Sequence, residues 1–368
     1  MKLILFLIML IFLAILVGAN IYLSQRFAYF LNLNKTWPLY LIFFAITIYM
    51  ISGIIIFSNA TSNTGSLLYC IAAILMGFML YLLLVLLLID GVNLIINIPV
   101  KVHLAIVVGL SVLISLYGIW NASNLKVTSM EIPINGITKE IHIMHLSDIH
   151  IGHFRGKMHL KKIINKTNSH NPDLVFITGD LFDGKINLSL EILDPLSELK
   201  AAVFFVDGNH DGYTGVKTIK HYLREKGVRV LENEIITFDE LQIIGLNHMS
   251  ADDQNTNIHA NEGHTIKEVL KTLTIDINKA SVLLHHSPVG IKYANDNGID
   301  LYLSGHTHAG QLFPINFLND LFFKYNKGLH KFKNTQVFVS QGAGTFGPPM
   351  RIGTISEISL IKLIPQSE

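Results

Sequence analysis

The chain has 368 residues, of which 50% are hydrophobic and only 15% are charged. This balance is too apolar for an ordinary soluble enzyme of that length. The formal net charge is +1 and no block of Lys or Arg occurs, so nothing in the composition indicates nucleic-acid binding. The single cysteine, Cys70, excludes a disulfide within the chain.

The apolar excess lies in residues 1–121, which we expect to form a transmembrane region. An uncharged segment must cross a hydrocarbon core of about 30 Å to span a bilayer. Four segments meet or nearly meet this length: 3–23, 37–57, 67–89 and 102–120, the last of which is extended by the flanking Val102 and His103. One such segment could be a buried helix, and the first could be a signal sequence. Four in succession indicate a multi-pass protein of the cell membrane.

The loops between these segments carry few charges, which still favour one orientation. Arg26 and Lys35 lie in the first connection, and Lys101 lies in the third, whereas the second carries no charge. Positively charged loops tend to remain in the cytoplasm. With four spans, the amino terminus and all residues after 121 are then expected on the non-cytoplasmic face.

Residues 122–138 are polar and lean toward extended structure, so we expect a linker there, followed by a second domain at 139–368. Five apolar runs of this domain read as strands that end in polar residues. The runs, with the residues that follow them, are 141–146 (Asp148, His150), 174–179 (Asp180), 203–208 (Asn209, His210), 281–285 (His286) and 301–305 (His306, His308). Open α/β sheets gather their ligands at the carboxyl ends of strands. Gly179, Gly208 and Gly305 allow the sharp turns that such an edge needs.

These side chains form a mixed set of carboxylate, amide and imidazole groups. Such a set suits two divalent cations that share a bridging carboxylate, the arrangement used in metal-dependent hydrolysis. Because no thiolate is included, Mn²⁺ is the expected metal, and Fe or Zn would also fit. A lone histidine is more often a surface or core residue. His159 and His248, which have no placed partner, are accordingly expected at the surface.

An apolar stretch follows the last of these runs, between Leu312 and Phe332, and includes Lys324, Lys327 and Lys331. Apolar residues with a basic fringe beside a metal site suit an amphipathic substrate or a bilayer surface. The same residues could instead pack into the core of the domain. Both interpretations stay open at this stage.

The polar residues belong to motifs with a defined order: SDIH (147–150), TGDLFD (178–183), GNHD (208–211), His286 followed by Pro288, and GHTHAG (305–310). In this order they resemble the signature of the calcineurin-like metallophosphoesterase superfamily, and its bacterial membrane-associated branch in particular. The resemblance covers Lys139 to about Leu363. Two residues depart from the branch, Gln341 where Arg is usual and Ser356 where Pro is usual, and both bear on substrate detail.

The resemblance implies an α/β fold, a four-layer metallophosphoesterase sandwich of two mixed sheets flanked by helices, preceded by the all-α region of four transmembrane helices. It also implies two divalent metal ions. The first would be held by Asp148, His150, Asp180 and His308, and the second by Asp180, Asn209, His286 and His306. The choice of His286 over His285 rests on the family's spacing to Pro288.

Three further residues have implied roles beside the metals. His210 is expected to be the general acid or the charge stabiliser at the leaving oxygen. Asp211 is expected to orient His210, and Asp183 to support the ligands without binding metal.

These expectations describe a membrane-anchored binuclear-metal phosphoesterase for phosphodiester or pyrophosphate bonds, with a lipid-like phosphate ester as substrate and the bilayer as partner. One alternative is a phosphomonoesterase or protein phosphatase. Another is a transport or sensing membrane protein whose second domain only binds. The intact motifs oppose the last alternative, because a site freed from catalysis has no need of His210 beside Asn209.

Overall fold

The computed structural model describes residues 2–184, 189–254 and 263–366, and the chain divides into two compact units. The helical unit is built mainly from Met1–Ser58 and Ser62–Ile119. The sandwich unit is built mainly from Trp120–Phe346 and Met350–Glu368. Each unit is described separately below.

The helical unit contains four long helices, which are α1 (Lys2–Phe30), α2 (Trp37–Phe57), α3 (Asn63–Asn93) and α4 (Val100–Ser123). By length and composition each can cross a membrane, with the candidate span of α1 running over Met9–Phe30. Phe43, Leu82 and Leu86 pack between the helices, whereas Ile55 and Leu88 are exposed on the outside. Apolar side chains on the outside are expected where lipid is the solvent. The predicted all-α region of four apolar helices is therefore confirmed.

A polar cluster connects three of these helices near their ends. Asp90 of α3 accepts a hydrogen bond from Tyr22 of α1 and pairs with Arg26 at 2.5 Å. His103 of α4 is buried, and its Nε2 lies 3.0 Å from Asp90 Oδ1. Ionisable groups in membrane helices pair with one another because each is costly alone. The cluster therefore ties α1, α3 and α4 together.

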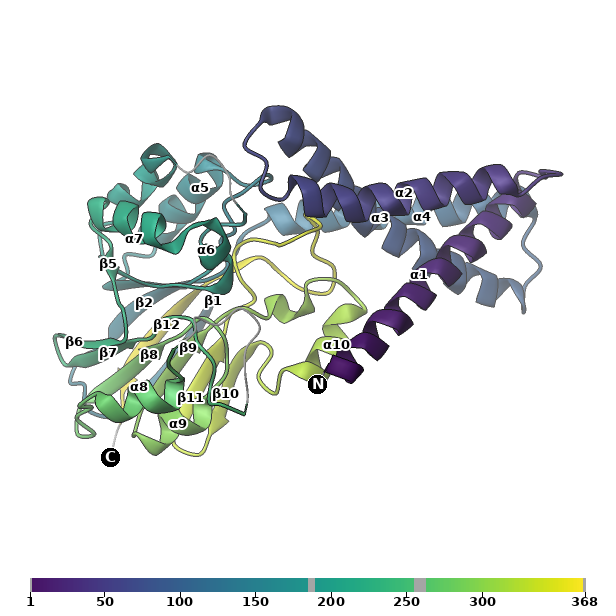
Figure 1. Cartoon of the computed structure of the whole chain (residues 1–368). Coiled ribbons are helices and arrows are strands. Elements are labelled where there is room, and N and C mark those ends of the chain that lie inside the picture. Colours follow the sequence, from purple (N-terminus) through teal and green to yellow (C-terminus); the bar gives the residue numbers. More distant parts are fainter. Residues whose placement is uncertain (1, 185–188, 255–262, 367–368) are drawn as a thin grey trace. The chain divides into compact units, whose positions relative to one another are not determined.

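The described part of the sandwich unit contains two six-stranded sheets (Figure 1). The first has the order β1 (Lys126–Ile134), β12 (Glu357–Pro365), β2 (Ile141–Leu146), β3 (Leu174–Thr178), β4 (Ala202–Val206) and β5 (Arg229–Val230). The second has the order β10 (Gly328–Phe332), β11 (Thr335–Val339), β9 (Leu301–Ser304), β8 (Ala280–Leu284), β7 (Leu241–Gly245) and β6 (Glu234–Phe238). Both are mixed, because β2 is antiparallel to β12, β10 to β11 and β6 to β7, while the other pairs are parallel.

Helices cover the outer faces of the two sheets. Figure 1 shows α5 and α7 over the first sheet and α8 and α9 over the second. The bounds are α5 (Lys157–Asn168), η1 (Leu190–Glu198), α6 (Asn209–Thr214), α7 (Val216–Glu225), α8 (Ile266–Thr272), α9 (Ile291–Asp296), η2 (His308–Gly310) and α10 (Ile315–Phe322). Three apolar cores alternate with these layers, one between the sheets and one under each helical layer. The predicted four-layer sandwich is confirmed.

Residues 122–138, for which the sequence predicts a linker, contain the edge strand β1. This strand pairs in parallel with β12 from Lys126 opposite Glu357 to Ile134 opposite Pro365. Ile132 and Ile134 are buried between the two sheets. Only Asn124 and Leu125 separate the end of α4 from the start of β1. The sequence of this segment leans toward extended structure, but its pairing was not expected, because the partner strand lies at the far end of the chain.

Candidate metal centre

All seven predicted ligands lie at the carboxyl ends of strands from both sheets. Asp148 and His150 follow β2, Asp180 follows β3, and Asn209 begins α6 after β4. His286 follows β8, while His306 and His308 follow β9. The structure therefore brings together the residues that the motifs single out. Most of them are buried, with Asn209 and His306 half-buried.

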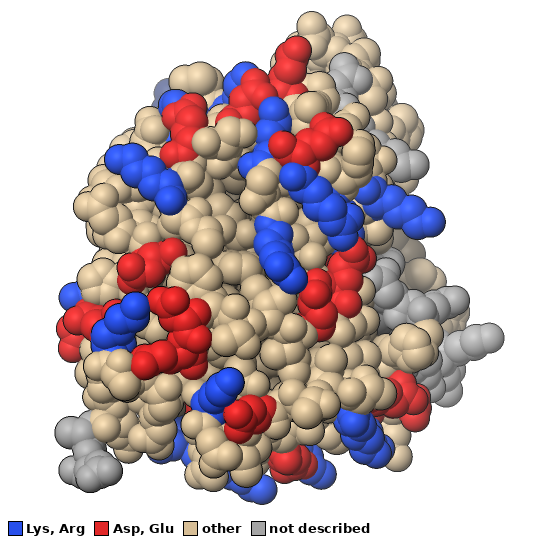
Figure 2. Space-filling model, turned by 90° about the vertical axis from the view of Figure 1, so that its left-hand side faces the viewer, with Lys and Arg blue, Asp and Glu red and all other residues tan. Residues whose placement is uncertain are grey.

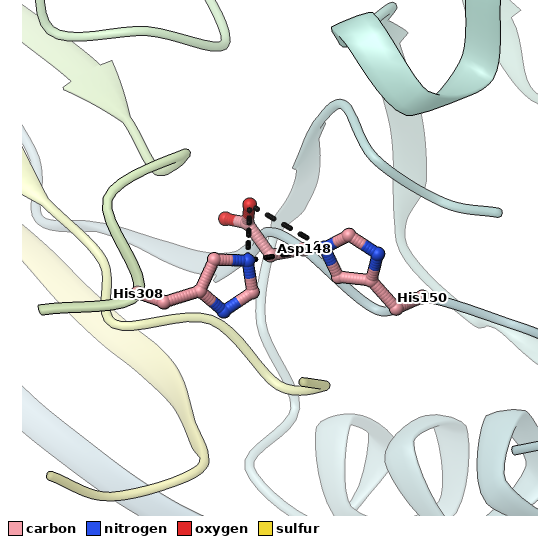
Figure 3. A group of neighbouring side chains, drawn as sticks. All are labelled: Asp148, His150 and His308. Atoms are coloured by element: carbon pink, nitrogen blue, oxygen red, sulfur yellow. Dashed lines mark hydrogen bonds and ion pairs between the residues drawn. The ribbon is translucent and has the colours of Figure 1, made fainter. Parts of the chain in front are cut away.

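Asp148, His150 and His308 form a first cluster (Figure 3). The Nε2 atom of His308 lies 3.3 Å from Asp148 Oδ1 and 3.0 Å from His150 Nε2. His150 Nε2 lies 3.9 Å from the same carboxylate oxygen. The three side chains come from two loops and point their polar atoms toward one another.

Asp180, Asn209, His286 and His306 form a second cluster around the Nε2 atom of His286. Asp180 Oδ2 lies 3.2 Å from this nitrogen, and Asn209 Oδ1 and His306 Nδ1 each lie 3.1 Å from it. The Nδ1 atom of His286 donates to the carbonyl oxygen of Thr178 at 2.8 Å. This bond orients the ring and leaves Nε2 available to a ligand.

Asp180 connects the two clusters. Its Oδ2 atom lies 3.8 Å from His150 Nε2 in addition to its contact with His286. Its Oδ1 atom accepts the backbone N–H of His210 at 2.8 Å, which holds the carboxylate in place. One carboxylate is thus shared between two sets of nitrogen and oxygen atoms, as a bridging ligand requires.

The spacing of these atoms fits a metal site. Ions held at about 2.1 Å by nitrogen and oxygen ligands keep those ligands roughly 3.0 to 3.5 Å apart. The separations within each cluster are 3.0 to 3.3 Å, and 3.9 Å at the widest pair described. The donor set also fits, because it combines carboxylate, amide and imidazole groups.

The electrostatics of the site favour added positive charge. Burial acts to lower the pKa of His286, but the charge of Asp180 and the hydrogen bond to it outweigh burial and raise this pKa to about 10. For Asp148, burial acts in the opposite direction, and the His308 charge and hydrogen bond hold the pKa of its carboxyl below the ordinary value. Burial lowers the pKa of the other ligand histidines, His150, His306 and His308, so these rings are neutral, as imidazoles that bind a cation must be.

The backbone of the site is strained where it carries the ligands. Asp148, His150, Asp180, His306 and His308 all have φ between 49° and 71°, the left-handed region that side chains other than glycine seldom adopt. Each such residue costs about 1–3 kcal/mol, a cost that persists mostly at functional sites. A Cβ atom on Gly208 would overlap the Asp180 carboxylate, so this position requires glycine.

His210 stands beside both clusters and pairs with Asp183. Its Nδ1 atom lies 2.9 Å from Asp183 Oδ1, and its ring lies against that of His150, 4.8 Å between ring centroids. Burial acts to lower the pKa of His210, but the charges of Asp180 and Asp183 and the Asp183 hydrogen bond raise it to about 9. The side chain is thus protonated at neutral pH in the metal-free protein.

The predicted role of Asp211 as the partner of His210 is wrong. Asp211 is the third residue of α6, and its carboxylate accepts the backbone N–H groups of Leu181, Phe182 and Gly208 at 2.9 to 3.2 Å. It therefore joins the two loops that carry Asp180 and His210. Asp183 takes the expected orienting role, because the loop after β3 brings it to the His210 ring.

A cavity of about 290 Å³ opens beside the clusters. Its polar lining includes Asp180, Asn209, His210, His306 and His308. Its apolar lining includes the side chains of Ile315, Phe323 and Phe346. A molecule in this cavity can therefore present a phosphate to the clusters and an apolar group to these three side chains.

The structure distinguishes His286 from its neighbour. His285 is buried, and both of its ring nitrogens are used outside the clusters, Nδ1 at 2.7 Å from the Ser287 carbonyl oxygen and Nε2 at 3.3 Å from the Met249 N–H. His142 and His145, in β2, lie outside the clusters as well.

Sequence reasoning missed two residues near the site. His248 was expected at the surface, yet it is only 2% exposed and its ring lies 5.5 Å from that of His286. Arg351 is fully buried and donates to the carbonyl oxygens of Gln341, Gly342 and Gly344, next to the backbone of Asp148. The position of His248 just after an apolar strand could have indicated that it belongs near the site. No local signal in the sequence marks Arg351. His159, expected at the surface, has its Nε2 atom buried.

Known proteins are similar to this chain in sequence. A family model described as calcineurin-like phosphoesterase matches residues 141–310. A metallophosphoesterase of Aquifex aeolicus is 30% identical over 69% of this chain and 97% of its own length. The chain belongs to the calcineurin-like metallophosphoesterases, a family that uses a dinuclear metal centre.

Other relatives come from bacteria and animals. A metallophosphoesterase of Helicobacter pylori strain J99 is 34% identical over 66% of this chain and 65% of its own length. A Danio rerio protein named "Transmembrane protein with metallophosphoesterase domain" is 33% identical over 69% of this chain and 61% of its own length. The chain thus spans less than two thirds of the length of these two relatives. The resemblance is not confined to bacterial proteins.

Proposed function

We propose that the chain is a membrane-anchored, binuclear-metal phosphoesterase that hydrolyses phosphodiester or pyrophosphate bonds. The observation that carries this proposal is the shared carboxylate of Asp180 between two clusters of ligand atoms, with the His210–Asp183 pair at the same cavity. In this proposal Asp148, His150, Asp180 and His308 hold the first ion. Asp180, Asn209, His286 and His306 hold the second.

Two cations held by these residues would supply Lewis-acid activation of the phosphoryl group and a nucleophile derived from water near neutral pH. The chain's own residues then position the ester. His210 stands at the cavity wall with a proton that Asp183 and Asp180 stabilise. It is therefore suited to donate this proton to the leaving oxygen, or to stabilise the charge that develops there. Asp183 holds the ring in the orientation for that transfer.

The proposed substrate is a lipid-like phosphate ester. This proposal is supported by the apolar side chains of Ile315, Phe323 and Phe346, which line the same cavity as the metal-site residues. Small-molecule sites commonly combine such an apolar lining with a few polar groups that fix orientation. The four apolar helices would hold the site near lipids. Mn²⁺ is the proposed metal, because the donor set contains carboxylates and imidazoles without thiolate.

The proposed function is tested with the full chain in lipid nanodiscs. After chelation, the protein is loaded with Mn²⁺, Fe²⁺ or Zn²⁺ and given a chromogenic diester, the matching monoester and a lipid pyrophosphate. We expect metal-dependent turnover of the diester or pyrophosphate above that of the monoester. Preference for the monoester would support a phosphomonoesterase instead, and no turnover with any metal would support a binding-only domain.

The variant His210→Gln tests whether His210 acts as a general acid or as a metal ligand. His150, Asp180 and His210 also lie close enough to share an ion, so the role of His210 needs its own test. We expect two ions per chain to remain, with a rate lower by roughly 10² to 10⁴. Loss of an ion in proportion to the loss of rate would make His210 a ligand.

The orientation across the membrane is also proposed, with the sandwich unit on the non-cytoplasmic face. It rests on Arg26, Lys35 and Lys101 in the loops between the apolar segments. A carboxyl-terminal reporter that works only outside the cytoplasm should be active, whereas one fused after Lys101 should be silent. The opposite pattern would reverse the orientation.

A further inference from the structure

Helix α10 has a polar side toward the protein and an apolar side toward solvent. On the inner side, the Asn319 amide donates to the carbonyl oxygen of Thr307 at 3.2 Å. The helix also packs closely on Gly310, where a Cβ atom would lie 2.5 Å from the Asn316 Cα. A helix at the surface of a water-soluble protein shows the reverse arrangement. The outward side of α10 is therefore built for an apolar neighbour.

The outward side carries Ile315, Phe317, Leu318 and Leu321, which we call the α10 patch. Their exposed fractions are 42%, 63%, 52% and 79%. Grouped apolar side chains of this size are rare on soluble surfaces and mark interaction sites. By contrast, the face in Figure 2 carries interspersed acidic and basic side chains, as a water-facing surface does.

Charge around the α10 patch favours a lipid surface. Lys324, Lys327 and Lys331 follow the helix within a short stretch, and all three are exposed. Apolar side chains bordered by Lys are typical of helices that lie in the headgroup region of anionic bilayers. Asp320 is also exposed on α10, and its carboxylate accepts the Asn326 amide at 2.7 Å.

We propose that the α10 patch inserts into the boundary between headgroups and acyl chains of the bilayer that the helical unit spans. The chain keeps the sandwich unit at that bilayer, because only Asn124 and Leu125 connect α4 to β1. Ile315 belongs both to the patch and to the wall of the cavity. If the proposed function holds, an acyl chain can pass from the bilayer into the cavity without crossing water.

Site-directed spin labelling tests this docking surface without any turnover. The single cysteine is removed with Cys70→Ser, and a nitroxide is attached after Leu321→Cys in the full chain in anionic liposomes. Ile277→Cys, at a residue 74% exposed in the turn between α8 and β8, is the matched control. Collisions with oxygen, which concentrates in lipid, are compared with collisions with a water-soluble nickel chelate.

We expect oxygen collisions to dominate at position 321 and nickel collisions to dominate at position 277. Nickel-dominated collisions at both positions would overturn the proposal. Shielding of position 321 from both reagents would also overturn it, in favour of a protein partner or a second copy of the chain. Because the readout is independent of catalysis, an inactive enzyme with a lipid-exposed label would contradict only the proposed function.

A second, independent observation concerns His248. Both of its ring nitrogens are buried without a hydrogen-bond partner, a situation that no other histidine in the described residues shows. Its backbone N–H donates to Asp207 at 2.8 Å, which fixes the loop after β7. Buried polar atoms without partners are unfavourable, and they commonly mark a place for an ion or water.

The His248 ring lies beside the second cluster, although it is not part of the group formed by Asp180, His286 and His306, whose ligand atoms lie within 4.8 Å of one another. Its centroid lies 5.5 Å from that of His286 and 6.2 Å from that of His306. Two imidazoles bound to one ion at about 2.1 Å have ring centres roughly 4.5 to 6.5 Å apart, depending on the angle between them. His285, which stacks on His248, has both nitrogens engaged elsewhere. We infer that His248 is a further ligand of the second ion.

Metal affinity tests this ligand directly. In His248→Phe, competition with a chelator should show at least about a tenfold loss of affinity at one site and none at the other. The retained site shows that the variant has folded. If His248→Phe does not fold, His248→Ala with added imidazole replaces it, and imidazole should restore the affinity. Two unchanged affinities, or no response to imidazole, would overturn the inference.

Discussion

The Nδ1 atom of His210 lies 2.9 Å from Asp183 Oδ1, and this pair joins the loop after β3 to the first turn of α6. The burial of His210 alone would lower its pKa, but Asp180 and Asp183 raise it to about 9. The proton of His210 therefore depends on a neighbour that is 27 residues away in the chain. This relationship determines the pH range in which His210 can act as an acid.

Asp183→Asn should move the alkaline limb of the pH–rate profile to lower pH. The substitution removes a negative charge beside His210, and such a charge shifts a pKa by about 1 unit or more. His210 then loses its proton at lower pH, and the rate falls earlier as pH rises. The measurement is the pH dependence of kcat/KM with full metal loading. An alkaline limb that stays in place would remove Asp183 from this role.

Asp211→Asn provides the contrast, because Asp211 bonds to backbone and not to His210. An amide can accept fewer of the N–H groups of Leu181, Phe182 and Gly208, so we expect a stability loss of about 1–3 kcal/mol. The alkaline limb should not move. Thermal denaturation gives the first quantity and the pH profile the second. A shifted limb with unchanged stability would restore the role predicted from the sequence.

The same pKa shift predicts how stability depends on pH in the metal-free protein. The His210 pKa rises from 6.5 to about 9 on folding. Protonation therefore stabilises the fold fully below pH 6.5, and this contribution is lost as pH rises through about 9. Melting temperatures in chelator should show the loss, and His210→Gln should remove this part of the pH dependence. An equal slope in both proteins would contradict the prediction.

The metal-ligand residues could be predicted from the sequence because the signals that mark them are local. Asp148, Asp180 and His306 each follow an apolar run within a few residues, and strand ends meet at one edge. The partner of His210 was not visible. Asp211 is its neighbour in sequence, but the first turn of α6 directs that carboxylate to backbone N–H groups.

Two other features depend on tertiary packing. The β1 strand exists because β12 returns from the carboxyl end of the chain to pair with it. For α10, the pattern of apolar residues left a packed core and a bilayer surface equally open. Packing of Asn319 against Thr307 decides the side that faces inward, and it leaves Leu321 exposed. Neither outcome follows from periodicity alone.

Asp180→Asn should lower bound metal from about two ions per chain and abolish turnover, because Asp180 is the proposed bridge. An amide has only one oxygen and no charge, so it cannot replace a carboxylate between two ions. Metal analysis and activity are measured on the same preparation. The control is Asp194→Asn, at an exposed carboxylate that pairs with Lys157 and Lys226. This variant should keep its bound metal and its activity. Full occupancy with a normal rate in the Asp180 variant would exclude the bridging role.

His286→Ala should remove the ion of the second cluster, whereas His285→Ala should keep it. His285→Ala should instead cost about 1–3 kcal/mol of stability, since the Met249 N–H and the Ser287 carbonyl lose a buried partner. A metal titration and a melting curve of each variant separate the two effects. If the results are exchanged, the ligand lies one position earlier in the chain.

Activity toward lipid-like esters should rise with acyl chain length, because the wall of Ile315, Phe323 and Phe346 is apolar. Each buried CH₂ contributes about 0.8 kcal/mol, so two added methylenes should raise kcat/KM roughly tenfold while the chain remains buried. Ile315→Asn should flatten this dependence and spare small soluble esters, which need only the metal ligands and His210. Ile277→Asn, at an exposed residue in the turn between α8 and β8 and outside the cavity lining, should keep it. The series is measured below the micelle threshold in nanodiscs. A rate that ignores chain length in the unchanged protein would leave a membrane-anchored phosphoesterase whose substrate is not a lipid.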